Sequence, residues 1–525
     1  MDNFKTPGVY VQEIATLPAS VAEVETAIPA FFGYTEKGSP NSPQRIGSLV
    51  EYQLYFGSAE PEKSISVTVT AQGDSSGTVT LDPAKRSKNI LFYAMQLYFA
   101  NGGGPCYIVS TGNFADGGNA SLDVYAAALA TVAKEEEPTL LIFPDASLYL
   151  QPAQYYALMN NALMQCQALG DRFAIIDVVD NGDPKKAKDD LRQYISANLD
   201  QAKYGAAYYP NLSTTLSYSY DPAAISINVA GDDEKAKALN DAGQKATSLR
   251  TEANTLKTNA DKLTKALPAE GADENAKKAA DAATDKANKA EVKAKAAEDA
   301  LAALVAGTQK QKFADLSNAL QNEVKQDIRD LSVVLPPSAA VAGVYANVDS
   351  TRGVWKAPAN VSLNYVDGPT TKITDDDQKD LNVDVTAGKS INAIRSFTGK
   401  GTKIWGARTL AGNDNEWRYV NVRRFFNMVE ESVKRSTGWA VFEPNDSNTW
   451  VKVRAMIENY LILKWKDGAL AGAKPDDAFF VRVGLGQTMS PDDVLEGRMN
   501  VEIGMAVVRP AEFIILKFSH KLQTS

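Results

Sequence analysis

The sequence predicts an α/β (α+β) core that carries extended strand arms at both ends and an inserted antiparallel helical hairpin. Short apolar runs alternate with helix-forming stretches between residues 89 and 209, which is typical of a mainly parallel sheet flanked by helices. Residues 232–310 contain no aromatic side chain and repeat Ala and Leu in alternating steps of three and four, which favours two packed helices.

The changes of pattern divide the chain into five predicted segments. These are an N-terminal arm (1–25), an α/β domain (26–231), a coiled-coil helical hairpin (232–310), a C-terminal core domain (311–506) and a C-terminal strand arm (507–525). A surface β-hairpin is expected as an insertion at about 64–81, because two alternating runs flank Gly73-Asp74-Ser75-Ser76.

The N-terminal arm begins with a turn and continues as a strand. Thr6-Pro7-Gly8 is a turn signal, and Val9, Tyr10 and Val11 have strand character. In the α/β domain we expect helices at 89–99 and 152–169, the second ending at Gly170, and strands at 106–110, 139–144 and 173–178.

Two apolar seams of similar length define the helical hairpin. The first includes Ala246, Ala253 and Ala260, the second includes Ala280 and Ala287, and a Pro-Gly turn at 268–271 separates them. Small seam residues let two helices approach closely. The alternative interpretation is a low-complexity insert without fixed structure.

The C-terminal core domain is predicted to contain two amphipathic helices, at 420–436 and 449–466, and a strand at 479–485. Arg423, Arg424 and Lys434 would make one face of the first helix basic, which suggests docking on an acidic partner surface. Lys434 could instead complement the C-terminal end of its helix.

The function depends on which sheet the last segment joins. Pro510 stands at the entrance of a dense apolar run, and the candidate strand residues are Phe513, Ile514, Ile515, Leu516, Lys517 and Phe518. This strand either joins a sheet of its own chain or adds to the open sheet edge of a neighbouring molecule.

Composition argues against several classes of function. The net charge of −9 disfavours a nucleic-acid or anionic-membrane binder, and no window of 18 apolar residues predicts a membrane span. The N-terminal residues show no signal-peptide pattern, so synthesis in the cytoplasm is expected. Cys106 and Cys166 are expected to be buried free thiols.

Catalytic and cofactor chemistry is also disfavoured. The single histidine, His520, leaves little for histidine catalysis or a histidine-rich metal site. The glycine-rich stretch at 101–105 lacks the Gly-Lys-Ser/Thr end of a phosphate loop, so a turn is the better interpretation. We therefore expect no catalytic residue, no metal and no cofactor. Two alternative classes of function are kept open: a static self-assembling tube or shell protein, and an α/β enzyme with a coiled-coil insert.

Several separate stretches together resemble the sheath proteins of contractile phage tails and of phage-tail-like, extracellular contractile injection systems. They include FKTPGVYVQEI (4–14), VETAIPAFFGYT (24–35), FANGGGPCYIVS (99–110), VLPPSAAVAGVYANVDSTRGVWKAPAN (334–360), NEWRYVNVRR (415–424), AVFEPNDSNTWVK (440–452) and residues 389–409 and 478–520. The stretches at 64–81 and 232–310 depart from the family pattern.

The resemblance implies a structural subunit and no enzyme. In the family, hexameric rings stack helically around an inner tube, terminal arms add strands to sheets of neighbouring subunits, and contraction drives the tube through a target membrane. Here the arms correspond to Thr6–Glu13, with Val9, Tyr10 and Val11, and to Glu512–Ser519, with Phe513 to Phe518. The implied partners are further copies of the chain, the inner tube protein, baseplate and cap proteins, and sheath paralogues; nucleic acid and direct membrane insertion are not implied. The helix at 420–436 would contact the tube through Arg423, Arg424 and Lys434, in a particle that can be released from the cell.

Overall fold

The computed structural model describes residues 21–70, 77–82, 85–180, 183–230, 233–265, 274–306, 309–311 and 313–516. The chain forms two compact units. The first unit comprises 1–59, 88–216 and 333–525, and the second comprises 60–87 and 217–332. The boundaries differ from the five predicted segments, because parts of the predicted α/β and C-terminal domains belong to the second unit.

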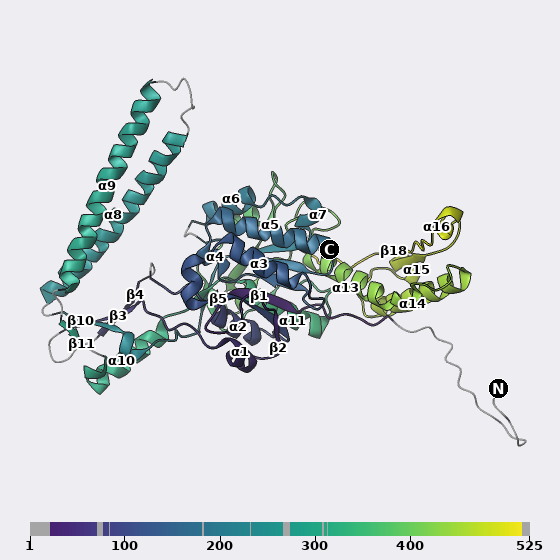
Figure 1. Ribbon diagram of the computed structural model, residues 1–525, viewed down its shortest axis with the longest axis horizontal. Helices are drawn as coiled ribbons and strands as arrows, with labels where there is room; N and C mark the ends of the chain where they lie inside the picture. The colour runs from purple at the N-terminus through teal and green to yellow at the C-terminus, as the bar shows by residue number, and fades with distance from the viewer. Residues whose placement is uncertain are drawn as a thin grey trace, which may run out of the picture. The chain divides into compact units, whose positions relative to one another are not determined.

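A nine-stranded sheet lies at the centre of the first unit (Figure 1). The strands, in spatial order, are β13 (Val361–Ser362), β16 (Gly401–Ile404), β15 (Ile391–Phe397), β8 (Gly205–Tyr209), β7 (Phe173–Asp177), β6 (Leu140–Ile142), β1 (Pro29–Thr35), β5 (Cys106–Asn113) and β2 (Gln44–Ile46). The run from β15 to β5 is parallel, and antiparallel strands close both edges. The predicted mainly parallel sheet is therefore confirmed.

Side chains of β1 alternate between two layers of helices. Phe32 and its neighbours on the same face join the core beneath α3 (Leu122–Val132), α5 (Pro152–Leu169) and α6 (Pro184–Tyr194). Phe31 points the opposite way and packs edge-on against Tyr98 of α2 (Leu91–Ala100). A second helix on that face, α11 (Ser338–Arg352), crosses α2.

Smaller elements complete the sheet region. They are α1 (Leu49–Phe56), η1 (Phe114–Asn119), α4 (Ala146–Tyr149), α7 (Leu199–Ala202), α12 (Asp375–Asn382) and a three-stranded sheet of β12 (Val334–Leu335), β9 (Leu212–Thr214) and β14 (Val366–Pro369).

The C-terminal part of the first unit packs helices against a small sheet. Its elements are α13 (Val420–Ser436), η4 (Gly438–Ala440), α14 (Ser447–Lys466), α15 (Pro475–Ala478), β17 (Phe479–Arg482), α16 (Pro491–Leu495) and β18 (Glu502–Met505). Its core is formed by α13 and α14 together with Val21 and Val481. Both predicted amphipathic helices are confirmed.

The second unit joins the two stretches predicted as separate insertions. The strands β3 (Ile65–Thr70) and β4 (Gly77–Leu81) form the predicted hairpin, and β10 (Ser226–Ala230) pairs with β3 in parallel. The strand β11 (Gln309–Gln311) pairs with β10, and η2 (Pro222–Ala224), η3 (Phe313–Asp315) and α10 (Asn318–Asp330) complete the unit.

The helical hairpin consists of α8 (Asp233–Lys265) and α9 (Glu274–Ala306), which lie side by side (Figure 1). Its most buried residues are alanines spaced seven apart: Ala246, Ala253 and Ala260 on α8, and Ala280, Ala287 and Ala294 on α9. A buried heptad column on each helix is the pattern of an antiparallel coiled coil with small core residues. All six positions belong to the seams that the sequence pattern predicts.

Candidate docking site of the C-terminal arm

The C-terminal arm follows its own chain only as far as residue 512. Beyond β18, Val507 bridges to Leu470, and the amide of Val508 donates to the carbonyl of Ala469 at 3.1 Å. No residue from 511 to 516 belongs to a strand. The last strand of the described chain, β18, ends at Met505, so the candidate strand residues Phe513–Leu516 form no strand within their own chain.

Four consecutive apolar side chains project into solvent at the described end of this arm. Phe513, Ile514, Ile515 and Leu516 are 71–80% exposed. A contiguous apolar stretch of this kind marks an interaction site in most soluble proteins. Of the other predicted arm residues, Lys517 and Phe518, like Val9, Tyr10 and Val11, lie outside the described residues.

The first unit also offers an open sheet edge. The strands β17 and β18 form a sheet of only two strands, with Phe479 opposite Met505 and Val481 opposite Ile503. Each strand therefore has one edge whose backbone groups find no ladder partner among the described strands. A two-stranded sheet is stable only when more strands or packed helices support it, and an open edge favours the addition of a further strand.

An apolar groove of about 880 Å³ runs beside β18. Val501, Ile503 and Met505 form one wall, and they alternate along the strand and so share one face. Side chains of α13 and α14, including Val433 and Ile457, form the opposite side. A strand laid along β18 would place every second side chain into this groove.

Phe442 stands at the rim of the groove in an unfavourable backbone conformation. Its φ is +68°, and its side chain is fully exposed. A bulky residue with positive φ is rare, and such strain concentrates at functional positions. Val441 beside it is also exposed, so the rim extends the apolar surface of the groove.

The predicted basic face of α13 is largely internal. Arg423 is only 2% exposed: its guanidinium stacks on Trp417 at 4.4 Å and on Tyr204 at 4.9 Å, and it bonds Glu430 at 2.9 Å. An arginine packed between aromatic rings gains both electrostatic and apolar contacts. The expectation that Arg423 presents a surface charge is therefore wrong.

Arg424 is also buried, at 4% exposure. Its guanidinium bonds both carboxylate oxygens of Asp349, donates to the carbonyl of Thr26 at 2.9 Å, and lies 4.6 Å from the ring centre of Tyr345. Lys434 alone of the three predicted contact residues is exposed, and it pairs with Glu431 at 3.1 Å. The two arginines therefore hold α13 in place from inside the first unit. The sequence pattern places them on one face of the helix but does not reveal that the fold covers this face.

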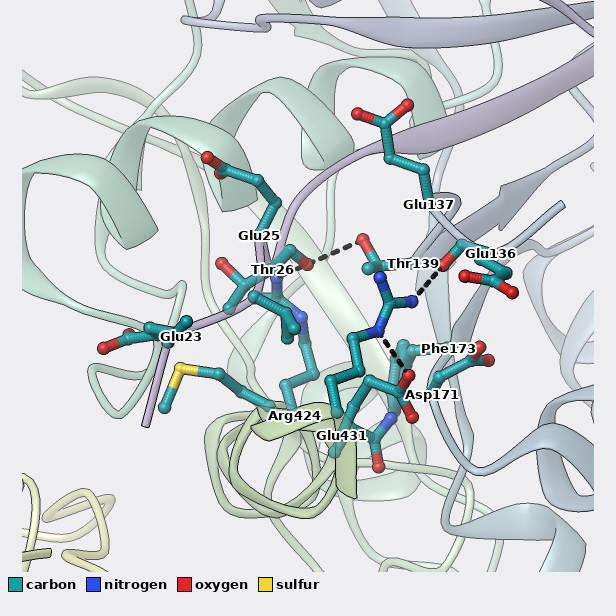
Figure 2. A pocket seen from close by; sticks show the side chains of 15 residues that line it. Glu23, Glu25, Thr26, Glu136, Glu137, Thr139, Asp171, Phe173, Arg424 and Glu431 are labelled. Carbon is teal, nitrogen blue, oxygen red and sulfur yellow. Dashed lines mark hydrogen bonds and ion pairs between the residues drawn. The ribbon is translucent and has the colours of Figure 1, made fainter. Parts of the chain in front are cut away.

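The entry of the N-terminal arm is bound along the same helix. The amides of Ala22 and Val24 donate to the hydroxyls of Ser436 and Ser432, each at 3.0 Å, and Glu23 pairs with Lys464. Beside this entry segment lies a pocket of about 320 Å³. Figure 2 shows Glu23, Glu25, Arg424 and Glu431 among the side chains that line it. Helix α13 therefore contacts the bases of both arms, since its Asn421 also donates to the carbonyl of Val508 at 3.2 Å.

The described residues contain no cluster of His, Cys, Asp and Glu that could hold a metal ion. Cys106 and Cys166 are free and buried, as predicted, and burial raises the pKa of both thiols well above the ordinary value. Within the same described ranges, no helix is both long and apolar enough to span a bilayer.

Comparison with known proteins identifies the relatives of this region. The model of the phage tail sheath C-terminal domain matches residues 412–521, which include α13, the groove and the exposed arm. The tail sheath protein of Vibrio phage KVP40 is 25% identical over 187 residues, or 35% of this chain and 26% of that protein. The tail sheath protein of Burkholderia phage BcepMu is 30% identical over 144 residues, or 26% of this chain and 30% of that protein. The alignments thus span less than a third of each relative.

Solved structures match along nearly the whole chain. A chain in the baseplate of the anti-feeding prophage is 29% identical, with a TM-score of 0.58, and the match covers 98% of this chain and 99% of that one. The sheath complex of an extracellular contractile injection system named PVC, in its contracted state, is 27% identical, with a TM-score of 0.58 and 98% coverage of both chains.

Proposed function

We propose that this chain, a homologue of the tail sheath proteins of contractile injection systems, is the subunit of a sheath that surrounds an inner tube. Subunits polymerise as stacked hexameric rings, and contraction of the sheath drives the tube through a target membrane. The observation that carries the proposal is that one chain has both an exposed apolar arm, Phe513–Leu516, and an open sheet edge at β18 with an apolar groove beside it. Among the described residues, none from Phe513 to Leu516 lines the groove, so it is open to the arm of another subunit.

In the assembled sheath, the arm of one subunit adds to the β17–β18 sheet of another. Backbone hydrogen bonds to the free edge hold the arm, and its alternating side chains enter the groove below. The N-terminal residues Val9, Tyr10 and Val11 add a strand to a neighbouring sheet in the same way. In the resulting network, backbone hydrogen bonds made by the arms of each subunit link it to its neighbours.

The strength of one such link follows from simple terms. Each net backbone hydrogen bond contributes about 0.5–1.5 kcal/mol. Burial of one large apolar side chain contributes about 1.5–3 kcal/mol. Two arm side chains in the groove and a few backbone hydrogen bonds together contribute more binding free energy than a typical surface contact. The loss of entropy on association offsets part of this gain. Many modest links along a tube then sum to the work of contraction.

The remaining partners follow from the proposed role. The sheath meets an inner tube protein, a baseplate at one end and a cap or terminator protein at the other, and sheath paralogues are further candidate partners. The particle assembles in the bacterial cytoplasm and acts outside the cell. Of the three residues first assigned to the tube contact, Lys434 keeps the exposure that such a contact requires.

The tube contact is tested by charge reversal at one position. Lys434 also lines the groove beside β18. If it contacts the tube, Lys434→Glu should prevent assembly of extended sheath on purified tube protein but leave tube formation by the chain alone unchanged. Tryptophan fluorescence serves as the folding control, since all six tryptophans lie in the first unit. Extended particles that form normally with the folded variant would remove Lys434 from the contact.

Electron microscopy of the full chain and of a chain that ends at Glu512 tests the main proposal. The full chain should form wide hollow helical tubes, whereas the shortened chain should stay folded and unassembled. Equal tube formation by both would refute the role of the arm. A static self-assembling tube is the alternative, and it predicts one tube diameter where a contractile sheath shows two.

A further inference from the structure

A clamp of three side chains, Arg408, Asn382 and Tyr419, holds the base of the C-terminal arm at Glu512. The Arg408 guanidinium binds this carboxylate with two nitrogens: Nε lies 2.9 Å from Oε1 and Nη2 lies 2.7 Å from Oε2. Asn382 Nδ2 donates to Oε1 at 2.8 Å, and the Tyr419 hydroxyl donates to Oε2 at 3.2 Å. Both carboxylate oxygens are therefore held from two sides, in the geometry that gives the strongest ion pairs.

The clamp is itself fixed to the central sheet. Asn392 of β15 accepts from the Arg408 amide at 2.7 Å and donates to the Arg408 carbonyl at 2.7 Å. The same Asn392 side chain also donates to the carbonyl of Ala207 in β8 at 3.1 Å. The Arg408 side chain is only 5% exposed. Arg408 is therefore hydrogen-bonded through Asn392 to two strands of the central sheet, β15 and β8.

The clamp covers part of the Glu512 side chain, which is 22% exposed. The residue as a whole is exposed, as are Ala511 and Phe513 on either side of it. Burial raises the pKa of the Glu512 carboxyl, but hydrogen bonds from Arg408 and Asn382 outweigh it and hold the pKa below its ordinary value. The carboxylate is therefore charged at neutral pH, and its ion pair with Arg408 persists there.

We infer that Glu512 is a positioning residue for subunit docking: its clamp by Arg408, Asn382 and Tyr419 sets the residue at which the arm leaves the subunit. This inference rests on the proposed function. A fixed departure point makes Phe513 the first residue free to pair, so the arm reaches the neighbouring sheet in one register. Because side chains alternate along a strand, a shift by one residue would turn the wrong side chains toward the groove.

The test separates arm position from folding. Cysteines introduced at Ala511 and, in a second protein, at Ile514 accept a nitroxide label, and the native thiols do not compete because both are buried. Glu512→Gln keeps the shape and removes the charge. Tyr419→Phe removes one donor to the carboxylate and gives a milder second variant. Glu458→Gln is the matched control, because Glu458 also pairs with an arginine, Arg454, but lies on α14 and is not among the residues that line the groove.

With Glu512→Gln, the label at position 511 should become as mobile as the label at 514, and the concentration needed for tube assembly should rise about tenfold. Tyr419→Phe should shift both readouts in the same direction by less, and Glu458→Gln should shift neither. An unchanged label at 511, or an unchanged assembly threshold, would overturn the inference. Failure of the unmodified chain to form tubes would count against the proposed function instead, and the label at 511 would still decide whether the clamp exists.

Discussion

Replacement of Arg424 by alanine measures how much the buried contacts of this residue on α13 contribute to the free energy of unfolding. In Arg424→Ala the Asp349 carboxylate, whose side chain is only 7% exposed, loses the guanidinium that faces both its oxygens. The carbonyl of Thr26 loses a donor, and Tyr345 loses its stacked cation. Removal of one partner from a buried ion pair costs about 3–5 kcal/mol, because the remaining charge stays in a dry environment.

This loss is large against the total stability of a typical domain, which is about 5–15 kcal/mol. Lys434→Ala is the matched control on the same helix, because its side chain is 72% exposed and its pairing with Glu431 spans one helical turn. We expect that variant to change the free energy of unfolding by less than about 0.5–1 kcal/mol.

Urea unfolding followed by tryptophan fluorescence measures both effects. All six tryptophans lie in the first unit, so the signal does not report on the helical hairpin. The midpoint should fall strongly for Arg424→Ala and barely for Lys434→Ala, with similar slopes. Similar midpoints for the two variants would show that Arg424 is not a buried anchor, and the surface role first predicted for it would have to be reconsidered.

Three further predictions concern other parts of the molecule. Gly343→Ala should destabilise the first unit by about 1–3 kcal/mol or more, measured by urea unfolding, because the new methyl group would lie 2.5 Å from the carbonyl oxygen of Tyr98 where α11 crosses α2. Ala253→Leu should lower the melting temperature of the hairpin in far-UV circular dichroism, since Ala253 is 1% exposed and a larger side chain forces α8 and α9 apart, whereas Val292→Ala, at an exposed position, should not. Burial raises the pKa of Asp177 to about 7, so between pH 4 and 7 the native state binds a proton that the unfolded state has released. The free energy of unfolding should therefore fall as pH rises through this range. In Asp177→Asn this fall should be smaller.

Each of these predictions has an outcome that contradicts it. A stable Gly343→Ala variant would mean that the two helices can separate without loss. An unaltered hairpin melt for Ala253→Leu would show that the seam is not tightly packed. Identical pH profiles for the parent chain and Asp177→Asn would show that the carboxyl, which accepts from the amide and hydroxyl of Ser338, does not titrate in the native state as its burial implies.

Periodicity in the sequence was sufficient for the elements that are stabilised locally. Alternating apolar runs predicted the parallel strands, and the heptad spacing of Ala246, Ala253 and Ala260 predicted α8, because burial of one face follows directly from the spacing of side chains along a helix or strand. The same reasoning found the apolar residues Phe513–Leu516, since a run of large apolar side chains is visible without knowledge of its surroundings.

Only the tertiary structure decided which faces are covered and which stretches meet. Arg423 and Arg424 read as surface charges because nothing in their spacing reveals the Trp417 ring or the Asp349 carboxylate, which approach from elsewhere in the chain. The joining of β3 with β10, more than a hundred residues apart, and the clamp of Arg408 on Glu512 are likewise long-range pairings. Local sequence determines what a segment can form, whereas the partner that buries it depends on how the whole chain packs.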